Sequence, residues 1–111
     1  SCERTFELMK QPVCFVGHTH VPVVFVKKPG RGVSYHDVET IRIEPGTQYI
    51  VNVGSVGQPR DSIPKAAYCI YDTESRTVQI KRAPYEVFSA RRRIVEAGLP
   101  HFLGDRLLTG N

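Results

Sequence analysis

Two histidines stand one residue apart directly after a short apolar run, and this spacing is typical of metal ligands. The run is Val13–Val16, and Gly17 separates it from His18 and His20, two of the four histidines of the chain. Side chains two residues apart in extended backbone point to the same side, and imidazole nitrogens are common ligands of first-row transition metals. The pattern predicts a metal site; the alternative is two histidines that hydrogen-bond locally at the end of a strand.

A second polar segment, residues 54–61, follows another expected strand and has the composition of an anion-binding loop. Successive N–H groups in glycine turns bind anions, and an arginine side chain matches phosphate with two parallel hydrogen bonds. The alternative is that the asparagine and the glycines only shape the turn. The candidate substrate-binding residues of this segment and of the strand before it are Asn52, Ser55, Gln58 and Arg60.

These segments carry a family resemblance. Gly-His-Thr-His at residues 17–20, with Pro22 after it, closely resembles the last signature motif of the calcineurin-like metallophosphoesterases. Asn-Val-Gly-Ser-Val-Gly-Gln-Pro-Arg at residues 52–60 is similar to a loop of the bacterial and archaeal phosphodiesterase branch, and residues 96–108 resemble the end of that branch. Three separated segments in the family's order extend the resemblance over nearly the whole chain.

The resemblance implies a function and a site. The implied fold is α/β, as part of a four-layer αββα sandwich. The implied function is hydrolysis of a phosphomonoester or phosphodiester by a water that bound metal ions activate. His18 would bind one of two divalent ions and His20 the other, and manganese, iron, zinc and nickel are all open. If both polar turns lie at one edge of a sheet, Arg60 can reach a phosphate held by the two metals.

The sequence departs from the family in what it lacks. The earlier family motifs Asp-x-His, Gly-Asp-x-x-Asp and Gly-Asn-His are absent, so the other ligands and the general acid are expected upstream. Residues 1–111 are therefore interpreted as the C-terminal portion of a single domain, with its N-terminal half as the missing partner, and the chain alone is expected to be inactive because two imidazoles cannot complete a metal site. A non-catalytic module on the same scaffold remains the alternative. A cupin-like metal site is weaker, because residues 23–26 hold no glutamate.

Composition sets the remaining limits. The chain has 111 residues, 41% hydrophobic and 23% charged, which is the composition of one small globular domain. Three cysteines without a Cys-x-x-Cys pair fit a reducing cytoplasm. No apolar run has the length of a membrane span. The net charge of +4 favours anionic ligands, leaves nucleic acid open as a partner, and does not decide whether the chain forms homo-oligomers.

The elements that must position the candidate residues are mostly strands. Alternating or continuous apolar patterns bounded by turn residues predict them, and a change to helical periodicity near Tyr85 predicts two terminal helices broken at Gly98 and Pro100. The expected strands are residues 13–16, 21–26, 33–38, 40–44, 48–53, 66–72 and 77–82, preceded by a short helix within residues 3–10. The run at residues 13–16 is expected to be buried on both faces.

Overall fold

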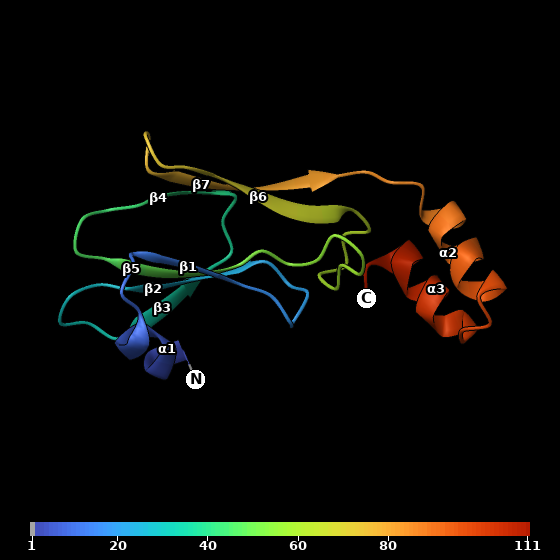
Figure 1. The fold of residues 1–111 in the computed structure, drawn as a ribbon, viewed down its shortest axis with the longest axis horizontal. Helices are drawn as coiled ribbons and strands as arrows, with labels where there is room; N and C mark the ends of the chain where they lie inside the picture. Colours follow the sequence, from blue (N-terminus) through green and yellow to red (C-terminus); the bar gives the residue numbers. More distant parts are fainter. Residues whose placement is uncertain (1) are drawn as a thin grey trace.

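The strands of the chain form two sheets that lie face to face (Figure 1). The computed structural model describes residues 2–111, with side chains from Arg4 onward. Sheet A has the strand order β1, β5, β2 and β3, which are Val13–Val16, Gln48–Asn52, Val23–Lys27 and Val33–His36. Sheet B has the order β4, β7 and β6, which are Thr40–Arg42, Thr77–Ala83 and Ala66–Asp72.

The core lies between the two sheets. Val24, Val26 and Val51 of sheet A are buried against Val78 of sheet B. Along β2, more and less buried residues alternate, as period two requires of a strand with one face on a core. Strands β1 and β5 are parallel, whereas all the other pairs are antiparallel. The predicted strands are therefore confirmed as elements: β1 and β6 have the predicted bounds, and the ends of the other five differ from the prediction by at most two residues.

Strand β1 is the clearest departure from expectation. It lies at the edge of sheet A, with β5 as its one neighbouring strand. Phe15 is 41% exposed and Val16 36% exposed. The prediction that residues 13–16 are buried on both faces is therefore wrong for the described chain. The prediction failed because a continuous apolar run shows that a strand has apolar side chains on both faces, but does not show which segments cover those faces.

The helices lie at the two ends of the sheets. Helix α1, Cys2–Leu8, packs on sheet A through the buried side chain of Phe6. Helices α2 and α3, Val87–Glu96 and His101–Thr109, form a hairpin beyond the strands (Figure 1). The two predicted terminal helices are thus confirmed, but in residues 2–111 they do not lie over either sheet, so the four-layer sandwich stays a prediction. None of the helices in these residues has the length and apolarity needed to cross a bilayer.

Candidate metal and phosphate site

The two polar segments lie side by side at one edge of sheet A. We call residues 17–21 the histidine turn and residues 54–61 the glycine loop. They follow β1 and β5, which are parallel neighbours with Val16 opposite Asn52. The N–H group of Val53 donates to the carbonyl of Val16 at 3.1 Å, which continues the pairing just beyond the strands. The structure therefore meets the condition set by the sequence for a shared site.

The histidine turn has an unusual backbone. His18 has a φ of 89° and His20 a φ of 63°, both in the left-handed region. Such residues cost about 1–3 kcal/mol each and persist where the surroundings determine them. The expectation of extended backbone here is wrong, because the chain must reverse and pass over the end of β5 to reach β2. The turn, and not strand alternation, sets the directions of the two imidazoles.

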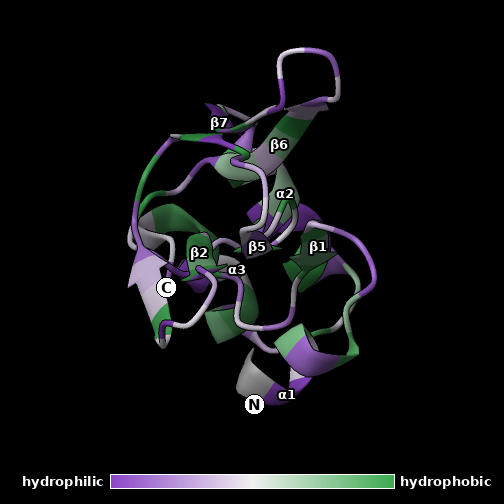
Figure 2. Cartoon of the chain, turned by 90° about the vertical axis from the view of Figure 1, so that its left-hand side faces the viewer, coloured by the Kyte–Doolittle hydropathy of each residue, from purple (hydrophilic) through white to green (hydrophobic). Residues whose placement is uncertain are grey.

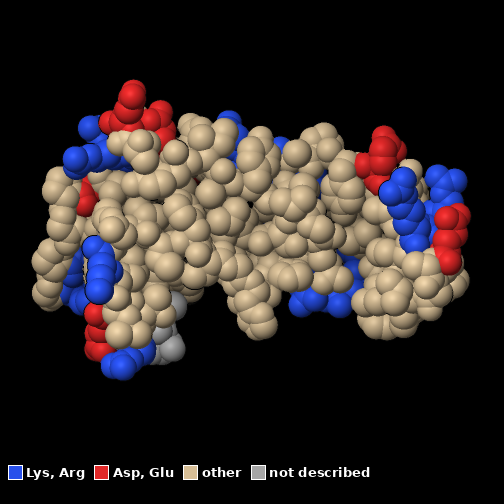
Figure 3. All heavy atoms as spheres, viewed as in Figure 1, with Lys and Arg blue, Asp and Glu red and all other residues tan. Residues whose placement is uncertain are grey.

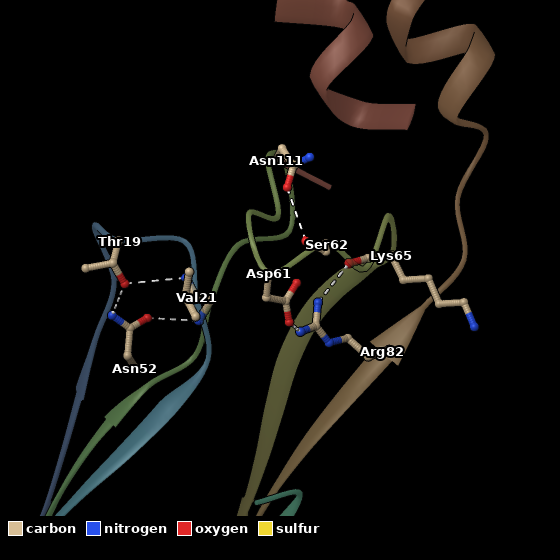
Figure 4. Close-up of polar contacts among 9 residues, drawn as sticks. Thr19, Val21, Asn52, Asp61, Ser62, Lys65, Arg82 and Asn111 are labelled. Atoms are coloured by element: carbon tan, nitrogen blue, oxygen red, sulfur yellow. Dashed lines mark hydrogen bonds and ion pairs between the residues drawn. The ribbon is translucent and has the colours of Figure 1, made fainter. Parts of the chain in front are cut away.

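Asn52, the last residue of β5, holds the two segments together (Figure 4). Its side-chain nitrogen donates to the carbonyl of Gly17 at 3.2 Å and to the hydroxyl of Thr19 at 2.9 Å. Its side-chain oxygen accepts from the N–H of Gly54 at 3.0 Å. Asn52 is only 4% exposed, so both of its amide hydrogens are used inside the fold. The structure places this predicted site residue beneath the turns, with no free donor for a ligand.

His20 joins the histidine turn to the glycine loop a second time. Its Nδ1 lies 2.8 Å from the carbonyl oxygen of Gln58. A carbonyl only accepts, so Nδ1 carries the hydrogen and Nε2 of the neutral ring keeps its lone pair. In return, the N–H of Arg60 donates to the carbonyl of His20 at 3.1 Å. Histidines that bind metals typically donate their other ring N–H to such a group, which fixes the tautomer and the ring orientation.

The remaining predicted residues line the same loop. The hydroxyl of Ser55 accepts from the N–H of Gln58 at 2.8 Å, and the side-chain oxygen of Gln58 accepts from Arg60 at 2.6 Å. Pro59 is fully buried and anchors the loop. Arg60 is exposed, so the rest of its guanidinium is open to solvent. The structure thus brings Ser55, Gln58 and Arg60 together with His20.

The donor set for metal is incomplete in this chain. His20 fits the role of a ligand, with Nδ1 hydrogen-bonded and Nε2 available. His18 is exposed at the same turn. In the described part of the chain, however, no group of three or more histidine, cysteine, aspartate or glutamate side chains converges as a metal site would require. The histidine turn can therefore contribute ligands to a metal centre but cannot complete one.

An ion pair that the sequence interpretation missed holds the far end of the glycine loop. The carboxylate of Asp61 forms an ion pair with the guanidinium of Arg82 in β7 (Figure 4). The side chain of Asp61 is 17% exposed and that of Arg82 is 20% exposed. Arg82 also donates to the carbonyl of Lys65 at 3.2 Å. Burial lowers the pKa of Arg82, and the nearby carboxylate of Asp37 opposes this effect. The sequence of β7 could have indicated this pair. Arg82 follows Val78 and Ile80 at intervals of two residues, so it lies on the same face of the strand as these apolar residues and needs a counter-charge there.

The C-terminal end of the chain supports the same loop. The N–H of Ser62 donates to the carbonyl of Gly110 at 2.9 Å, and the hydroxyl of Ser62 donates to the side chain of Asn111 at 3.2 Å. Gly110 ends α3 in the left-handed conformation, and an added Cβ there would lie 2.8 Å from the backbone of Ile63. Sheet B and the helical hairpin therefore both hold the residues that follow Arg60.

Comparison with known proteins identifies the class of this fold. No protein-family model matches the chain. A solved crystal structure of a metallophosphoesterase from Sphaerobacter thermophilus superimposes with a TM-score of 0.82 and 38% sequence identity, over 96% of this chain and 45% of that chain. An uncharacterised protein of Methanocaldococcus jannaschii is 42% identical over 96 residues, which are 86% of this chain and 38% of the relative.

These matches define what the chain is similar to. The chain spans less than half the length of both relatives. It has the fold of part of a metallophosphoesterase over nearly its whole length, and the family resemblance expected from the histidine and glycine segments is thereby confirmed.

Proposed function

We propose that the chain supplies one half of the active site of a metal-dependent phosphoesterase. His18 binds one of two divalent ions and His20 the other, and the glycine loop binds the phosphate of the substrate. The observation that carries this proposal is the pair of hydrogen bonds between His20 and the glycine loop, because they hold the histidine turn beside Arg60 at one edge of sheet A. When bound, two divalent ions neutralise phosphate charge and activate a water for attack.

The residues of this chain have distinct tasks in the proposed site. Gln58 holds His20 through its backbone carbonyl and orients Arg60 through its side-chain oxygen. Arg60 then presents its remaining N–H groups to the phosphate oxygens, where a guanidinium forms two parallel hydrogen bonds. Ser55 lies in the same loop and keeps a hydroxyl hydrogen to donate. Asn52 is a positioning residue for both turns.

The proposal extends to the rest of the domain. The other metal ligands and the general acid come from a part of the domain outside residues 1–111, so this chain alone binds metal weakly and hydrolyses nothing. The substrate class is a phosphomonoester or a phosphodiester. The free, half-buried thiols of Cys14 and Cys69 support a reducing compartment, and a cytoplasmic location is part of the proposal.

The test needs a complete domain. In a chimaera, residues 1–111 replace the matching segment of the Sphaerobacter thermophilus metallophosphoesterase. His18→Ala and His20→Ala are each expected to lower bound manganese and to lower hydrolysis of p-nitrophenyl phosphate and bis-p-nitrophenyl phosphate severely. The matched control is His36→Ala, since His36 is exposed on β3 and contacts Ser34. If both histidine variants keep metal and activity at the level of the control, the site assignment is wrong.

Arg60 separates phosphate binding from metal binding. Arg60→Ala in the chimaera should lower kcat/KM about 10-fold to 1000-fold, or about 1.4–4 kcal/mol, the range for one charged transition-state contact. Metal content should not change, because arginine is not a ligand. Arg60→Lys should restore part of the loss, since it keeps the charge but not the bidentate geometry. The alternative, a non-catalytic module, would be favoured if the chimaera bound metal but hydrolysed neither ester while the Sphaerobacter thermophilus protein hydrolysed them.

A further inference from the structure

The segment that follows Arg60 in the chain rests on the end of helix α3. The N–H of Ser62 donates to the carbonyl of Gly110 at 2.9 Å, and its hydroxyl donates to the side chain of Asn111 at 3.2 Å. Figure 4 shows Asn111 directed toward Ser62. Gly110 is buried, and a Cβ added to it would lie 2.8 Å from backbone atoms of Ile63. The position of this segment therefore depends on where α3 ends.

Ser62 has a strained backbone. Its φ is 66°, in the left-handed region that residues other than glycine rarely adopt. Such a conformation is costly and persists where the surrounding structure determines it. On one side of Ser62 the surroundings are its hydrogen bonds to Gly110 and Asn111. On the other side, the ion pair of Asp61 with Arg82 fixes the preceding residue. Strain of this kind, two residues after a candidate phosphate-binding arginine, indicates a functional constraint.

The end of α3 is a closed cap. The N–H groups of Gly110 and Asn111 both donate to the carbonyl of Arg106, at 2.9 and 3.2 Å. The side chain of Arg106 donates in return to the carbonyl of Asn111 at 2.8 Å. Gly110 has a φ of 72°, the left-handed conformation in which glycine commonly ends a helix. The two residues that hold Ser62 are thus fixed to α3.

Helices α2 and α3 pack on each other as one unit. Arg91 of α2 pairs with Asp105 of α3 at 2.7 Å, and a Cβ added to Gly104 would lie 2.8 Å from the side chain of Arg91. The chain enters this hairpin from β7 and returns from α3 to the glycine loop (Figure 1). Figure 2, which looks along the long axis of Figure 1, shows α3 behind β2 and β5, so the two views place α3 in line with the end of sheet A. A displacement of the hairpin would therefore move Ser62.

The hairpin contributes no group of its own to the candidate site. None of the predicted site residues lies in α2 or α3. Figure 3 shows basic and acidic side chains together at the end of the molecule that the hairpin forms. Because charges of both signs lie together there, this end does not favour phosphate binding by itself. An effect of the hairpin on a bound phosphate must therefore pass through Arg60.

We infer that Ser62 and Gly110 are positioning residues for Arg60, and that the α2–α3 hairpin fixes the backbone from which the guanidinium reaches the phosphate. This inference rests on the proposed function, in which Arg60 binds the phosphate of the substrate. The backbone of Arg60 is held on its other side, where its N–H donates to the carbonyl of His20 at 3.1 Å. With both sides fixed, the side chain loses less freedom when it binds phosphate, and it meets the phosphate in the right direction.

The first test measures this role in the chimaera. Gly110→Ala should lower kcat/KM for p-nitrophenyl phosphate about 3-fold to 30-fold with bound manganese unchanged, because the added methyl group displaces the backbone of Ile63. The matched control is Gly98→Ala, since Gly98 has a φ of 81° beyond α2 but nothing lies within 4 Å of an added Cβ. Both substitutions strain a left-handed glycine, and only Gly110→Ala touches the loop. Asn111→Ala carries the test if Gly110→Ala does not fold.

The same substitutions in an Arg60→Ala background separate positioning from general damage. A residue that acts only through the Arg60 side chain should cost less than about 2-fold once that side chain is absent. A loss of the same size in both backgrounds would overturn the inference, as would a Gly110→Ala chimaera as active as Gly98→Ala. If Arg60→Ala alone changes nothing, the proposed phosphate role of Arg60 fails, and the inference fails with it.

A second measurement does not depend on catalysis. In the metal-free chimaera, amide hydrogen exchange at Ser62 should be about 10-fold or more faster in Gly110→Ala than in Gly98→Ala, because the acceptor carbonyl moves away from the Ser62 N–H. Exchange at Arg60 should also become faster, since its backbone is held from both sides. If both amides keep the rates of the unsubstituted chimaera in Gly110→Ala, the hairpin does not hold the loop. The inference is then overturned even where Arg60 binds phosphate, and the proposed function stands.

Discussion

Asn52→Ala tests whether one buried amide holds the two turns in place. The substitution removes two donated hydrogen bonds and one accepted bond. Each net hydrogen bond contributes about 0.5–1.5 kcal/mol, so three of them contribute about 1.5–4.5 kcal/mol. Asn52 is 4% exposed, and water reaches the partner groups poorly after truncation. We expect the free energy of unfolding to fall by about 2–4 kcal/mol.

The assay is urea unfolding of the 111-residue chain at one fixed concentration, followed by circular dichroism because the chain has no tryptophan. Ser55→Ala is the matched control, since it removes one accepted hydrogen bond from the same loop and should cost about 0.5–1.5 kcal/mol. In the chimaera, Asn52→Ala should also lower metal content although Asn52 is not a ligand. The positioning role of Asn52 would be refuted if Asn52→Ala lowered the free energy of unfolding by less than about 0.5 kcal/mol and by no more than Ser55→Ala does.

The remaining predictions concern the same loop and its supports. Gly54→Ala should cost more than about 2 kcal/mol, because Gly54 has a φ of 84° and an added Cβ would lie 2.7 Å from a proline ring carbon. Arg82→Met should cost about 2–4 kcal/mol, because it leaves the carboxylate of Asp61 unpaired in a mostly buried place. Burial raises the pKa of Cys69, so the folded thiol keeps its proton at pH values where the unfolded thiol loses it. Stability should therefore fall as pH rises above the unfolded pKa, and Cys69→Val should weaken this dependence.

Each of these predictions has a control or a contrary outcome. Gly57→Ala should be nearly neutral, since nothing lies within 4 Å of an added Cβ there. Arg91→Met should cost under about 1 kcal/mol, because its partner Asp105 is 54% exposed. Equal losses for the two glycine variants, or for the two arginine variants, would contradict the packing described here. A pH dependence that is unchanged in Cys69→Val would show that burial of this thiol contributes nothing.

Local sequence patterns predicted the parts of the fold that depend on local chemistry. Apolar runs bounded by turn residues located the strands, and the order of the histidine and glycine segments after two strands led to a shared edge. The left-handed backbone of His18 and His20 was not predictable in this way, because it follows from the crossing over β5. The Asp61–Arg82 pair joins residues 21 positions apart in different elements, so only the paired sheet shows it. The edge position of β1 was missed because composition reports apolar surface but not its neighbours.

The central claim is that His18 and His20 bind metal beside the glycine loop, and the most direct measurement is crystallographic. We expect crystals of the chimaera soaked in manganese to give two anomalous peaks, one at about 2.0–2.3 Å from an imidazole nitrogen of His18 and one at the same distance from Nε2 of His20. Nδ1 of His20 should still donate to Gln58. Manganese peaks that lie away from both imidazoles in a folded, active chimaera would contradict the claim.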